Sequence, residues 1–288
     1  MAINEKDIGE RDIRLFQETI SEYSDYDFSD YSANSLRRRL NRILDSYGSD
    51  FDRLIETIRT DEEALEEIVK KITVSTTELF RDPTIWQHII QKVFPRFKLH
   101  SSINIWHSGC STGQEVYSMM IALDQFGLLE RANIYASDIN SDVMKIAKKG
   151  DYRLRFNREY ISNFNDVFSP GMSEATGQQF KTHEKYLKIN ESRDLIQMKE
   201  FLRSKPVYKK IDLVKDDNLF FLNFDIIMCR NVIIYFNYEL QNKVLRLFHR
   251  SMRESGCLVL GLHESIIGPG TKYFQKQNNY YVRMKKDA

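Results

Sequence analysis

The chain has 288 residues, of which 42% are hydrophobic and 29% charged, and its formal net charge is +1. These values are typical of a soluble globular protein with one large or two moderate domains, and the near-neutral charge argues against a nucleic-acid-binding protein. Because the chain has no membrane-length apolar run, no secretory leader and only three distant cysteines, we expect a cytoplasmic protein without a metal site or direct membrane insertion.

Residues 1–72 are expected to form a small domain made only of helices. Hydrophobic residues at helical spacing are clearest in the second helix, which Gly48 can end. Thr60 and Glu63 have the spacing of a capping box at the start of the fourth helix. The expected helices are Asp12–Tyr23, Ser35–Tyr47, Phe51–Ile58 and Thr60–Ile72.

From Asp82 onward the expected helices and strands alternate. Asp82 can cap a helix that has Pro83 at its first position and runs to about Phe97. The other expected helices are Gly113–Phe126, Ser141–Lys149 and Tyr238–Arg253, and the expected strands are Ile103–Trp106, Asn133–Ser137, Phe224–Cys229, Gly256–Leu260 and Tyr280–Met284. This alternation predicts an α/β domain over residues 73–288, with a mostly parallel sheet covered on both faces and a late antiparallel strand.

Residues 151–206 interrupt the alternation. The stretch is polar, contains Pro170 and Gly171, and has two possible strands near Phe180–Ile189 and Leu195–Phe201. We therefore expect a small antiparallel subdomain inserted into the second domain.

A glycine-rich turn, Gly109–Glu115, follows the first expected strand. In open parallel sheets ligands bind beyond the carboxyl ends of the strands, and Gly109 and Gly113 allow the backbone to approach a ligand closely. The turn has neither the lysine of a phosphate loop nor the G-x-G-x-x-G pattern of a dinucleotide loop. It ends in Glu115, whose carboxylate disfavours phosphate and suits a cationic group such as the ammonium or sulfonium of S-adenosylmethionine.

Asp138, at the tip of the next expected strand, suits the hydroxyls of a ribose. Each feature alone can be structural, because glycine turns are common and Asp138 can cap the helix that follows. Together they favour a methyltransferase that uses S-adenosylmethionine. His107, just before the turn, can also line the site, although a packed or capping role is favoured.

Four segments carry a resemblance to a known family. They are Ser75–Asp82, Trp106–Ser118, Ala136–Asn140 and Phe224–Phe236, and the last, with Cys-Arg-Asn-Val before Ile-Tyr-Phe, is the most specific. On these segments the chain resembles the chemotaxis receptor glutamate methyltransferases, the CheR family. The resemblance implies a Rossmann-like methyltransferase fold behind a helical domain. It also implies S-adenosylmethionine as the methyl donor and glutamate carboxylates on the cytoplasmic helices of chemoreceptors as the acceptors.

The resemblance further implies roles for individual residues. The positions that match cofactor contacts are Ser75, Thr77, Arg81, Gly109, Glu115, Asp138, Asp212, Leu213, Arg230 and Asn231. Within this set Glu115 corresponds to the acid at the methionine end of the cofactor and Asp138 to the ribose acid. Asp212 and Leu213 correspond to contacts near the adenine. Arg81 and Tyr235 match residues at the reaction site and are the candidate catalytic residues.

Four positions depart from the family's pattern. Ser75 stands where the family has asparagine, and Leu79 where it has the first of two phenylalanines. Gln114 and Val116 stand where it commonly has glutamate and proline. The insertion 151–206 is expected to match the family poorly, so binding of a receptor tail peptide there stays an open question.

The chemistry of a glutamate substrate agrees with this assignment. Its carboxylate is ionised at pH 7, so methyl transfer needs no general base and the protein mainly positions the nucleophile. Arg81 can hold such a carboxylate through two parallel hydrogen bonds, although an ordinary surface salt bridge would also explain it. Tyr235 can equally be a core residue beside Ile233 and Phe236.

Four arginines, Arg37, Arg38, Arg39 and Arg42, lie on the second expected helix. Arg38 and Arg42 point away from its apolar stripe, and the other two flank the stripe. The cluster can be a solvated face, or Arg38, Arg39 and Arg42 can form a docking surface for an acidic helical partner. The two interpretations carry equal weight.

The leading hypothesis is therefore an S-adenosylmethionine-dependent protein-glutamate O-methyltransferase that acts on chemoreceptors and produces glutamyl methyl esters and S-adenosylhomocysteine. The divergent insertion leaves room for a methyltransferase of another signalling protein. The departures at Ser75 and Leu79 leave room for a non-enzymatic regulator that binds the cofactor.

Overall fold

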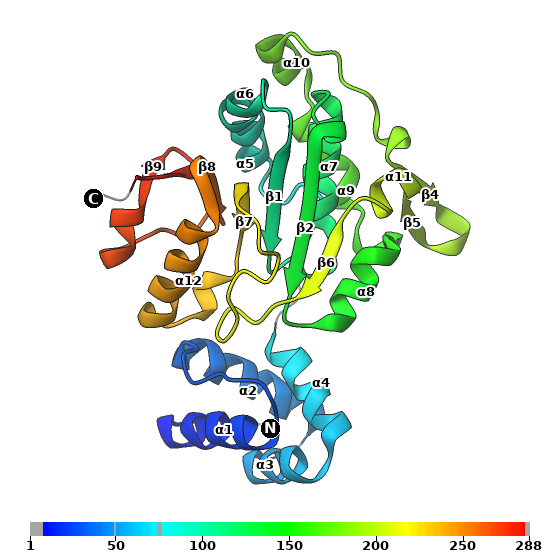
Figure 1. Cartoon of the computed structure of the whole chain (residues 1–288). Coiled ribbons are helices and arrows are strands. Elements are labelled where there is room, and N and C mark those ends of the chain that lie inside the picture. The colour runs from blue at the N-terminus through cyan, green and yellow to red at the C-terminus, as the bar shows by residue number, and fades with distance from the viewer. Residues whose placement is uncertain (1–7, 49, 74–76, 286–288) are drawn as a thin grey trace. The chain divides into compact units, whose positions relative to one another are not determined.

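A computed structural model covers the whole chain and describes residues 8–48, 50–73 and 77–285 (Figure 1). The chain divides into two compact units. One unit joins the N-terminal helices, up to Val74, with the later segment Ile233–Val244. The other holds Ser75–Val232 and Leu245–Ala288. No helix in the described ranges is long and apolar enough to cross a membrane.

The first unit is built around four helices. They are α1 (Glu10–Tyr23), α2 (Ala33–Tyr47), α3 (Phe51–Thr60) and α4 (Glu62–Ile72). The expectation that Thr60 caps the fourth helix is wrong, because the carboxylate of Asp61 accepts a hydrogen bond from the Ala64 amide at 3.0 Å. Apolar faces of the helices form the core of the unit, in which Phe16, Leu36 and Leu40 are fully buried.

The segment Ile233–Val244 completes this unit. It contains the short helix η6 (Ile233–Tyr235) and the first half of α12 (Tyr238–Arg250). The amide of Ser32 donates to the carbonyl of Tyr235 at 2.9 Å, and the rings of Tyr31 and Phe236 meet edge to face at 5.3 Å. These contacts fix the segment against the chain between α1 and α2.

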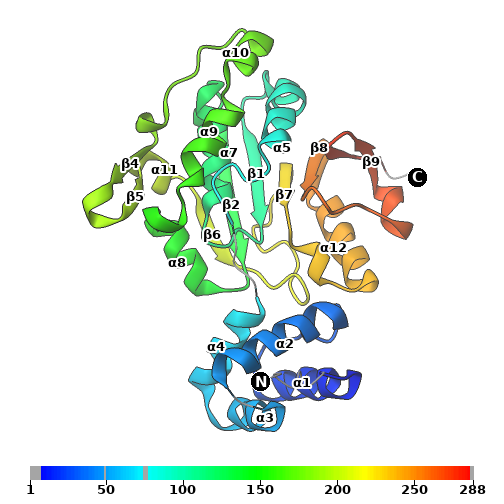
Figure 2. The ribbon, with the colours of Figure 1, turned by 180° about the vertical axis from the view of Figure 1, so that it is seen from behind.

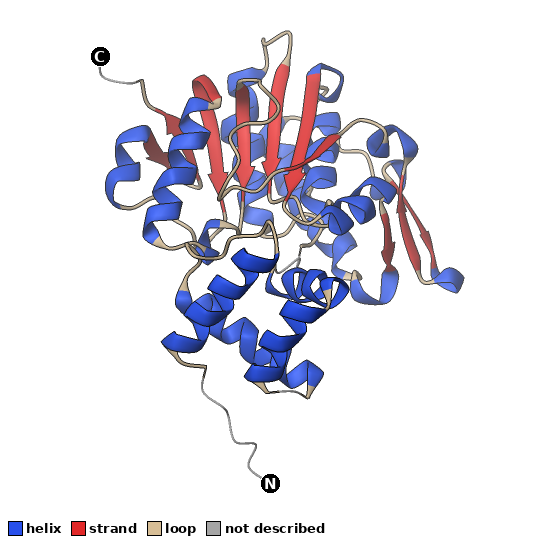
Figure 3. Cartoon of the chain, turned by 60° about the horizontal axis from the view of Figure 1, so that its bottom comes forward, coloured by secondary structure: helices blue, strands red, loops and turns tan. Residues whose placement is uncertain are grey.

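The second unit contains a seven-stranded sheet with the order β6-β2-β1-β7-β8-β10-β9. The strands are β1 (Ile103–Ser108), β2 (Ala132–Asp138), β6 (Val207–Lys210), β7 (Phe224–Cys229), β8 (Met252–Leu260), β9 (Phe274–Gln277) and β10 (Tyr280–Arg283). The first five in spatial order pair in parallel, and β10 pairs antiparallel with both β8 and β9. This arrangement confirms the predicted mostly parallel α/β sheet with a late antiparallel strand (Figure 3).

Strand β6 was not predicted from the sequence. It is a short edge strand that pairs in parallel with β2, with Lys210 beside Asp138. The amide of Ile211 then donates to the carbonyl of Asp138 at 3.2 Å. The pairing therefore brings the chain that follows β6 to the carboxyl end of β2.

The helix expected from Pro83 to Phe97 consists of α5 (Pro83–His88), a π-helical turn (Ile89–Val93) and α6 (Phe94–Phe97). Pro95 has no amide hydrogen for the helical ladder, which accounts for the wider turn before it. Asp82 occupies the N-cap position with Pro83 after it, as expected, but it is in the left-handed region with φ 56° and its side chain makes no cap bond.

Helix α7 (Gln114–Gln125) follows β1, and α8 (Ser141–Lys149) follows β2. Helices α5, α7 and α9 (Glu159–Val167) lie on the face of the sheet that Figure 2 shows. On the opposite face, Trp106 packs edge to face on Phe248 at 5.5 Å. Helix α12 ends at Arg250 rather than Arg253, because β8 already begins at Met252.

The insertion contains the expected small antiparallel sheet. Its order is β3-β5-β4, with β3 (Asp151–Arg153), β4 (Leu187–Asn190) and β5 (Leu195–Met198), and α9, α10 (Pro170–Thr176) and α11 (Glu200–Arg203) accompany it. The strand expected near Phe180–Ile189 is the shorter β4 at the end of that range.

Asp124 at the end of α7 fastens the insertion to the main unit. Its carboxylate accepts hydrogen bonds from the hydroxyl of Tyr186 at 2.8 Å and the ammonium of Lys181 at 3.1 Å, and Lys185 forms a further ion pair. Burial alone would raise the pKa of Asp124, but these donors outweigh burial and lower it below its usual value.

We predict that Asp124→Asn lowers the free energy of unfolding at pH 7 by about 1 kcal/mol, because partly exposed ion pairs contribute little each. Since the folded state depresses the pKa of Asp124, this contribution is present above the ordinary pKa and is lost as the pH falls through the folded value. Urea unfolding between pH 7 and pH 3 should therefore show a shallower acid decline for the variant. Asp217→Asn, at an exposed pair with Arg250, is the control and should match the wild type.

Candidate active site

The turn after β1 is held in place by the neighbouring strand. The amides of Gly109 and Cys110 both donate to the carbonyl of Ser137, at 2.8 and 2.9 Å. Gly109 and Gly113 have φ angles of 76° and 93°, in the region that favours glycine. The turn is thus anchored at the carboxyl edge of the sheet, where the sequence predicted a ligand site.

Gly113 also sets the distance between α7 and α8. A Cβ atom at this position would lie 2.6 Å from the Cβ of Ala147. The hydroxyl of Tyr117, one turn into α7, donates to the carbonyl of Ala147 at 2.7 Å. Only glycine allows this approach of the two helices.

Asp138 ends β2 beside the turn. Its two oxygens accept hydrogen bonds from the amides of Ser111 at 2.8 Å and Asn140 at 2.9 Å. The carboxylate does not cap α8, because the side chain of Asn140 accepts from the Asp142 amide instead. Burial raises the pKa of Asp138, against the effect of the backbone donors. The amide of Ile139 is a third backbone donor, and a carboxylate has about four acceptor sites, so Asp138 can still accept from a ribose hydroxyl.

Glu115 lies in the first turn of α7 between two nitrogen donors. Nδ1 of His107 is 2.8 Å from Oε1, and Nη1 of Arg230 is 3.4 Å from Oε2. Burial would raise the pKa of Glu115, but the hydrogen bond from His107 and the charge of Arg230 outweigh it and lower the pKa. Glu115 is therefore an anion at the glycine turn.

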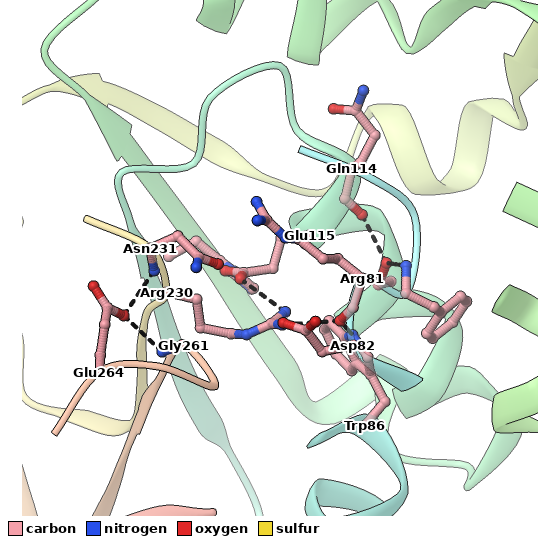
Figure 4. Close-up of polar contacts among 12 residues, drawn as sticks. Arg81, Asp82, Trp86, Gln114, Glu115, Arg230, Asn231, Gly261 and Glu264 are labelled. Carbon is pink, nitrogen blue, oxygen red and sulfur yellow. Dashed lines mark hydrogen bonds and ion pairs between the residues drawn. The ribbon is translucent and has the colours of Figure 1, made fainter. Parts of the chain in front are cut away.

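Arg230 follows β7 and joins three segments of the chain (Figure 4). Its Nη2 donates to Oδ2 of Asp82 at 2.7 Å and to the carbonyl of Arg81 at 2.8 Å. The same carbonyl accepts from the indole of Trp86 at 3.1 Å. Only 2% of the Arg230 side chain is exposed, so these acceptors neutralise a buried charge.

Glu264 supports the residue after Arg230, a role that the sequence did not reveal. One of its oxygens accepts from the amides of Asn231 at 2.7 Å and Gly261 at 2.6 Å. Asn231 is in the left-handed region with φ 59°. The only sequence signal for this role is that Glu264 lies three residues after Gly261, at the end of a strand.

Two tyrosines of the insertion hold the glycine turn from the other side, and sequence reasoning missed both. The hydroxyl of Tyr152 donates to the carbonyl of Thr112 at 2.8 Å, and Nε2 of Gln114 donates to the hydroxyl of Tyr160 at 2.7 Å. The insertion is thus part of the framework of the site.

The second unit brings most of the predicted cofactor contacts to one edge of the sheet. Gly109, Glu115, Asp138, Arg230 and Asn231 lie at the ends of β1, β2 and β7, and Asp212 and Leu213 follow β6 beside Asp138. Thr77 and Arg81 precede α5 and are half-buried, and Ser75 lies outside the described residues.

Tyr235 and the arginines of α2 belong to the first unit. The guanidinium of Arg39 lies 3.8 Å from the centre of the Tyr235 ring and donates to the carbonyl of Ile72. Arg39 is only 3% exposed, so the expectation that it contributes to a docking surface is wrong. Arg38 and Arg42 are exposed, as the helical spacing predicted.

The residues at the sheet edge fit S-adenosylmethionine. Glu115 is an anion near the turn, which suits the ammonium group, and the Asp138 carboxylate at the end of β2 is an acceptor that suits the ribose hydroxyls. Within the described ranges, no group of three or more histidine, cysteine, aspartate or glutamate side chains could hold a metal ion.

Two family models match the chain. The model described as "CheR methyltransferase, all-alpha domain" matches residues 11–73, and "CheR methyltransferase, SAM binding domain" matches residues 75–168 and 171–282. The second match includes the insertion apart from residues 169–170, so the expectation that this region matches the family poorly is wrong.

Three relatives cover most of the chain. A methyltransferase called Cher3 from Pseudomonas putida is 35% identical over 257 residues, which span 88% of this chain and 89% of that protein. A chemotaxis protein methyltransferase from Listeria monocytogenes is 26% identical over 275 residues, spanning 94% and 97%. Chemotaxis protein methyltransferase 1 from Pseudomonas aeruginosa is 28% identical over 244 residues, spanning 79% and 80%.

We predict that Gly113→Ala lowers the free energy of unfolding by about 2–4 kcal/mol, because it combines a left-handed backbone with overpacking against Ala147. Gly177→Ala is the matched control, since Gly177 has φ 65° but nothing within 4 Å of the added Cβ. The free energy of unfolding of this control variant should fall by only about 1 kcal/mol. Equal losses in urea unfolding would show that contact with Ala147 does not contribute.

Proposed function

Because this chain belongs to the CheR methyltransferase family and binds S-adenosylmethionine as that family does, we propose that it methylates glutamate side-chain carboxylates on the cytoplasmic helices of chemoreceptors. The products are glutamyl methyl esters and S-adenosylhomocysteine. The observation that carries the proposal is the anionic Glu115 at the glycine turn, beside Asp138 at the end of the next strand.

When bound, S-adenosylmethionine supplies an electrophilic methyl group on a sulfonium. Glu115 would hold its ammonium group, Asp138 its ribose hydroxyls, and Asp212 and Leu213 would lie near its adenine. Gly109, Arg230 and Asn231 shape the same edge, and Ser75 and Thr77 complete the proposed set. Burial of Arg230 among Asp82, Glu115 and the Arg81 carbonyl keeps these elements in a fixed geometry.

Methyl transfer to a carboxylate requires positioning more than acid–base chemistry. The substrate carboxylate is already ionised and supplies the electron pair for the new carbon–oxygen bond, so no proton has to move. Arg81 is the proposed group that holds this carboxylate, and its backbone is fixed by the hydrogen bonds from Arg230 and Trp86 to its carbonyl. Tyr235 is the second proposed catalytic residue. Correct orientation contributes up to about 7–11 kcal/mol in favourable reactions.

The two parts of the chain have separate proposed tasks. Residues 1–72, which form one unit together with Ile233–Val244, meet the receptor through the exposed Arg38 and Arg42. Residues 73–288, with the insertion 151–206, contain the residues proposed for methyl transfer. The chemotaxis names of the relatives support a receptor as substrate, since two of them are chemotaxis protein methyltransferases.

We predict that Arg81→Ala lowers kcat/KM for methyl transfer about 10- to 100-fold, because charge-assisted hydrogen bonds contribute about 1.5–3 kcal/mol. The assay incubates the protein with labelled S-adenosylmethionine and a receptor cytoplasmic fragment, and measures base-labile methyl esters. Arg81→Lys keeps the charge without two parallel bonds and should fall between Arg81→Ala and the wild type. Arg155→Ala, at an exposed pair of the insertion, is the control and should retain wild-type activity.

Absence of label on every acidic receptor helix would contradict the receptor as substrate. Label on another signalling protein would then assign the activity to that substrate. Tight cofactor binding with no transfer to any candidate protein would instead indicate a non-enzymatic regulator.

We predict that the double substitution Arg38→Glu and Arg42→Glu raises KM for the receptor fragment at least about fivefold, because like charges then oppose an acidic partner. The dissociation constant for S-adenosylhomocysteine should stay unchanged. Arg59→Glu, on the exposed side of α3, reverses a charge elsewhere in the unit and serves as control. An unchanged KM for the double variant would assign the α2 arginines to a solvated face.

A further inference from the structure

His107 is a buried histidine with one engaged and one free nitrogen. Its side chain is 0% exposed, and Nδ1 is 2.8 Å from Oε1 of Glu115. Among the described residues, Nε2 has no hydrogen-bond partner. The residue ends a strand in the middle of the sheet, where it pairs with Ala136 on one side and Met228 on the other.

This geometry defines the protonation of the ring. A carboxylate only accepts, so the nitrogen facing Glu115 carries a proton. A second proton would place an N–H group on the buried Nε2 without an acceptor, which is an unfavourable arrangement. The neutral ring, with its proton on Nδ1, avoids that cost and leaves Glu115 a full negative charge.

We propose that His107 is a positioning residue for the cofactor: the N–H group at its Nδ1 holds Glu115 in the orientation that binds the ammonium group of S-adenosylmethionine. The inference rests on the part of the proposed function that assigns the ammonium group to Glu115. Without this donor Glu115 would keep its longer contact with Arg230, at 3.4 Å, and would lose the fixed orientation of its carboxylate.

Arg230, the other side-chain donor to Glu115 among the described residues, does not fix the carboxylate in the same way. Its Nη1 is 3.4 Å from Oε2, and its Nη2 donates to Asp82 at 2.7 Å. Nδ1 of His107, at 2.8 Å from Oε1, is the shorter of these two contacts. The pKa of Glu115 is lowered, with burial opposing the shift, so the group that His107 orients is an anion.

The test measures ligand dissociation constants by calorimetry at pH 7.5 for the wild type and for variants of His107. S-adenosylhomocysteine carries the ammonium group, whereas 5′-methylthioadenosine has the same nucleoside without the amino-acid portion. A variant that loses only the orientation of Glu115 should bind S-adenosylhomocysteine more weakly and bind 5′-methylthioadenosine as the wild type does.

Two variants separate positioning from packing. In His107→Asn the amide nitrogen can replace Nδ1 as a donor, so affinity for S-adenosylhomocysteine should stay within about twofold of the wild type. In His107→Leu the donor is lost, so the dissociation constant of S-adenosylhomocysteine should rise about tenfold while that of 5′-methylthioadenosine stays unchanged. His183→Asn, in the insertion, is the control and should keep the wild-type affinities.

A His107→Leu variant with wild-type affinity for S-adenosylhomocysteine would overturn the proposal, and so would an equal loss of affinity for both ligands. If His107→Leu does not fold, His107→Asn decides alone, because a large loss of affinity for S-adenosylhomocysteine with a donor still in place would overturn the proposal. Because no receptor is present, these measurements are independent of the substrate. Lack of methyl transfer with the expected affinities would contradict only the receptor substrate, whereas wild-type affinity of His107→Leu would contradict only the role of His107.

Discussion

The need to neutralise the buried guanidinium of Arg230 determines how the site is assembled. With 2% of its side chain exposed, this cation would be strongly destabilising without acceptors close by. Asp82 and the Arg81 carbonyl supply them from the start of α5, and Glu115 from the start of α7. The Arg230 guanidinium therefore binds the starts of α5 and α7 to the carboxyl end of β7. The position of each of these three segments depends on the other two.

Those parts of the fold that follow from local patterns could be predicted from the sequence. The spacing of apolar residues identified α2, α8 and β7, because short-range periodicity and capping decide such elements. Strand β6 has two lysines and is held by its pairing with β2, which no local pattern contains. Asp82 has the sequence of a helix cap, but its long-range ion pair with Arg230 takes precedence over capping.

The candidate site divides in the same way. Glu115 and Asp138 could be predicted because each follows a strand and the distance between them along the chain matches one β-α-β unit. The side chains that hydrogen-bond to these two acids could not be predicted. The role of His107, for example, follows only from its contact with Glu115 across the turn. Tyr152 and Tyr160 lie in the insertion, where no local pattern marks them, yet their hydroxyls support the glycine turn.

The return of Ile233–Val244 to the unit of the N-terminal helices has a consequence for how this architecture can be recombined. A chimera that exchanges only the first 72 residues between relatives would separate Tyr31 from Phe236 and Arg39 from Tyr235. The helical unit is therefore not a contiguous module. It is inherited as two pieces of sequence, and a viable exchange needs both pieces from the same parent.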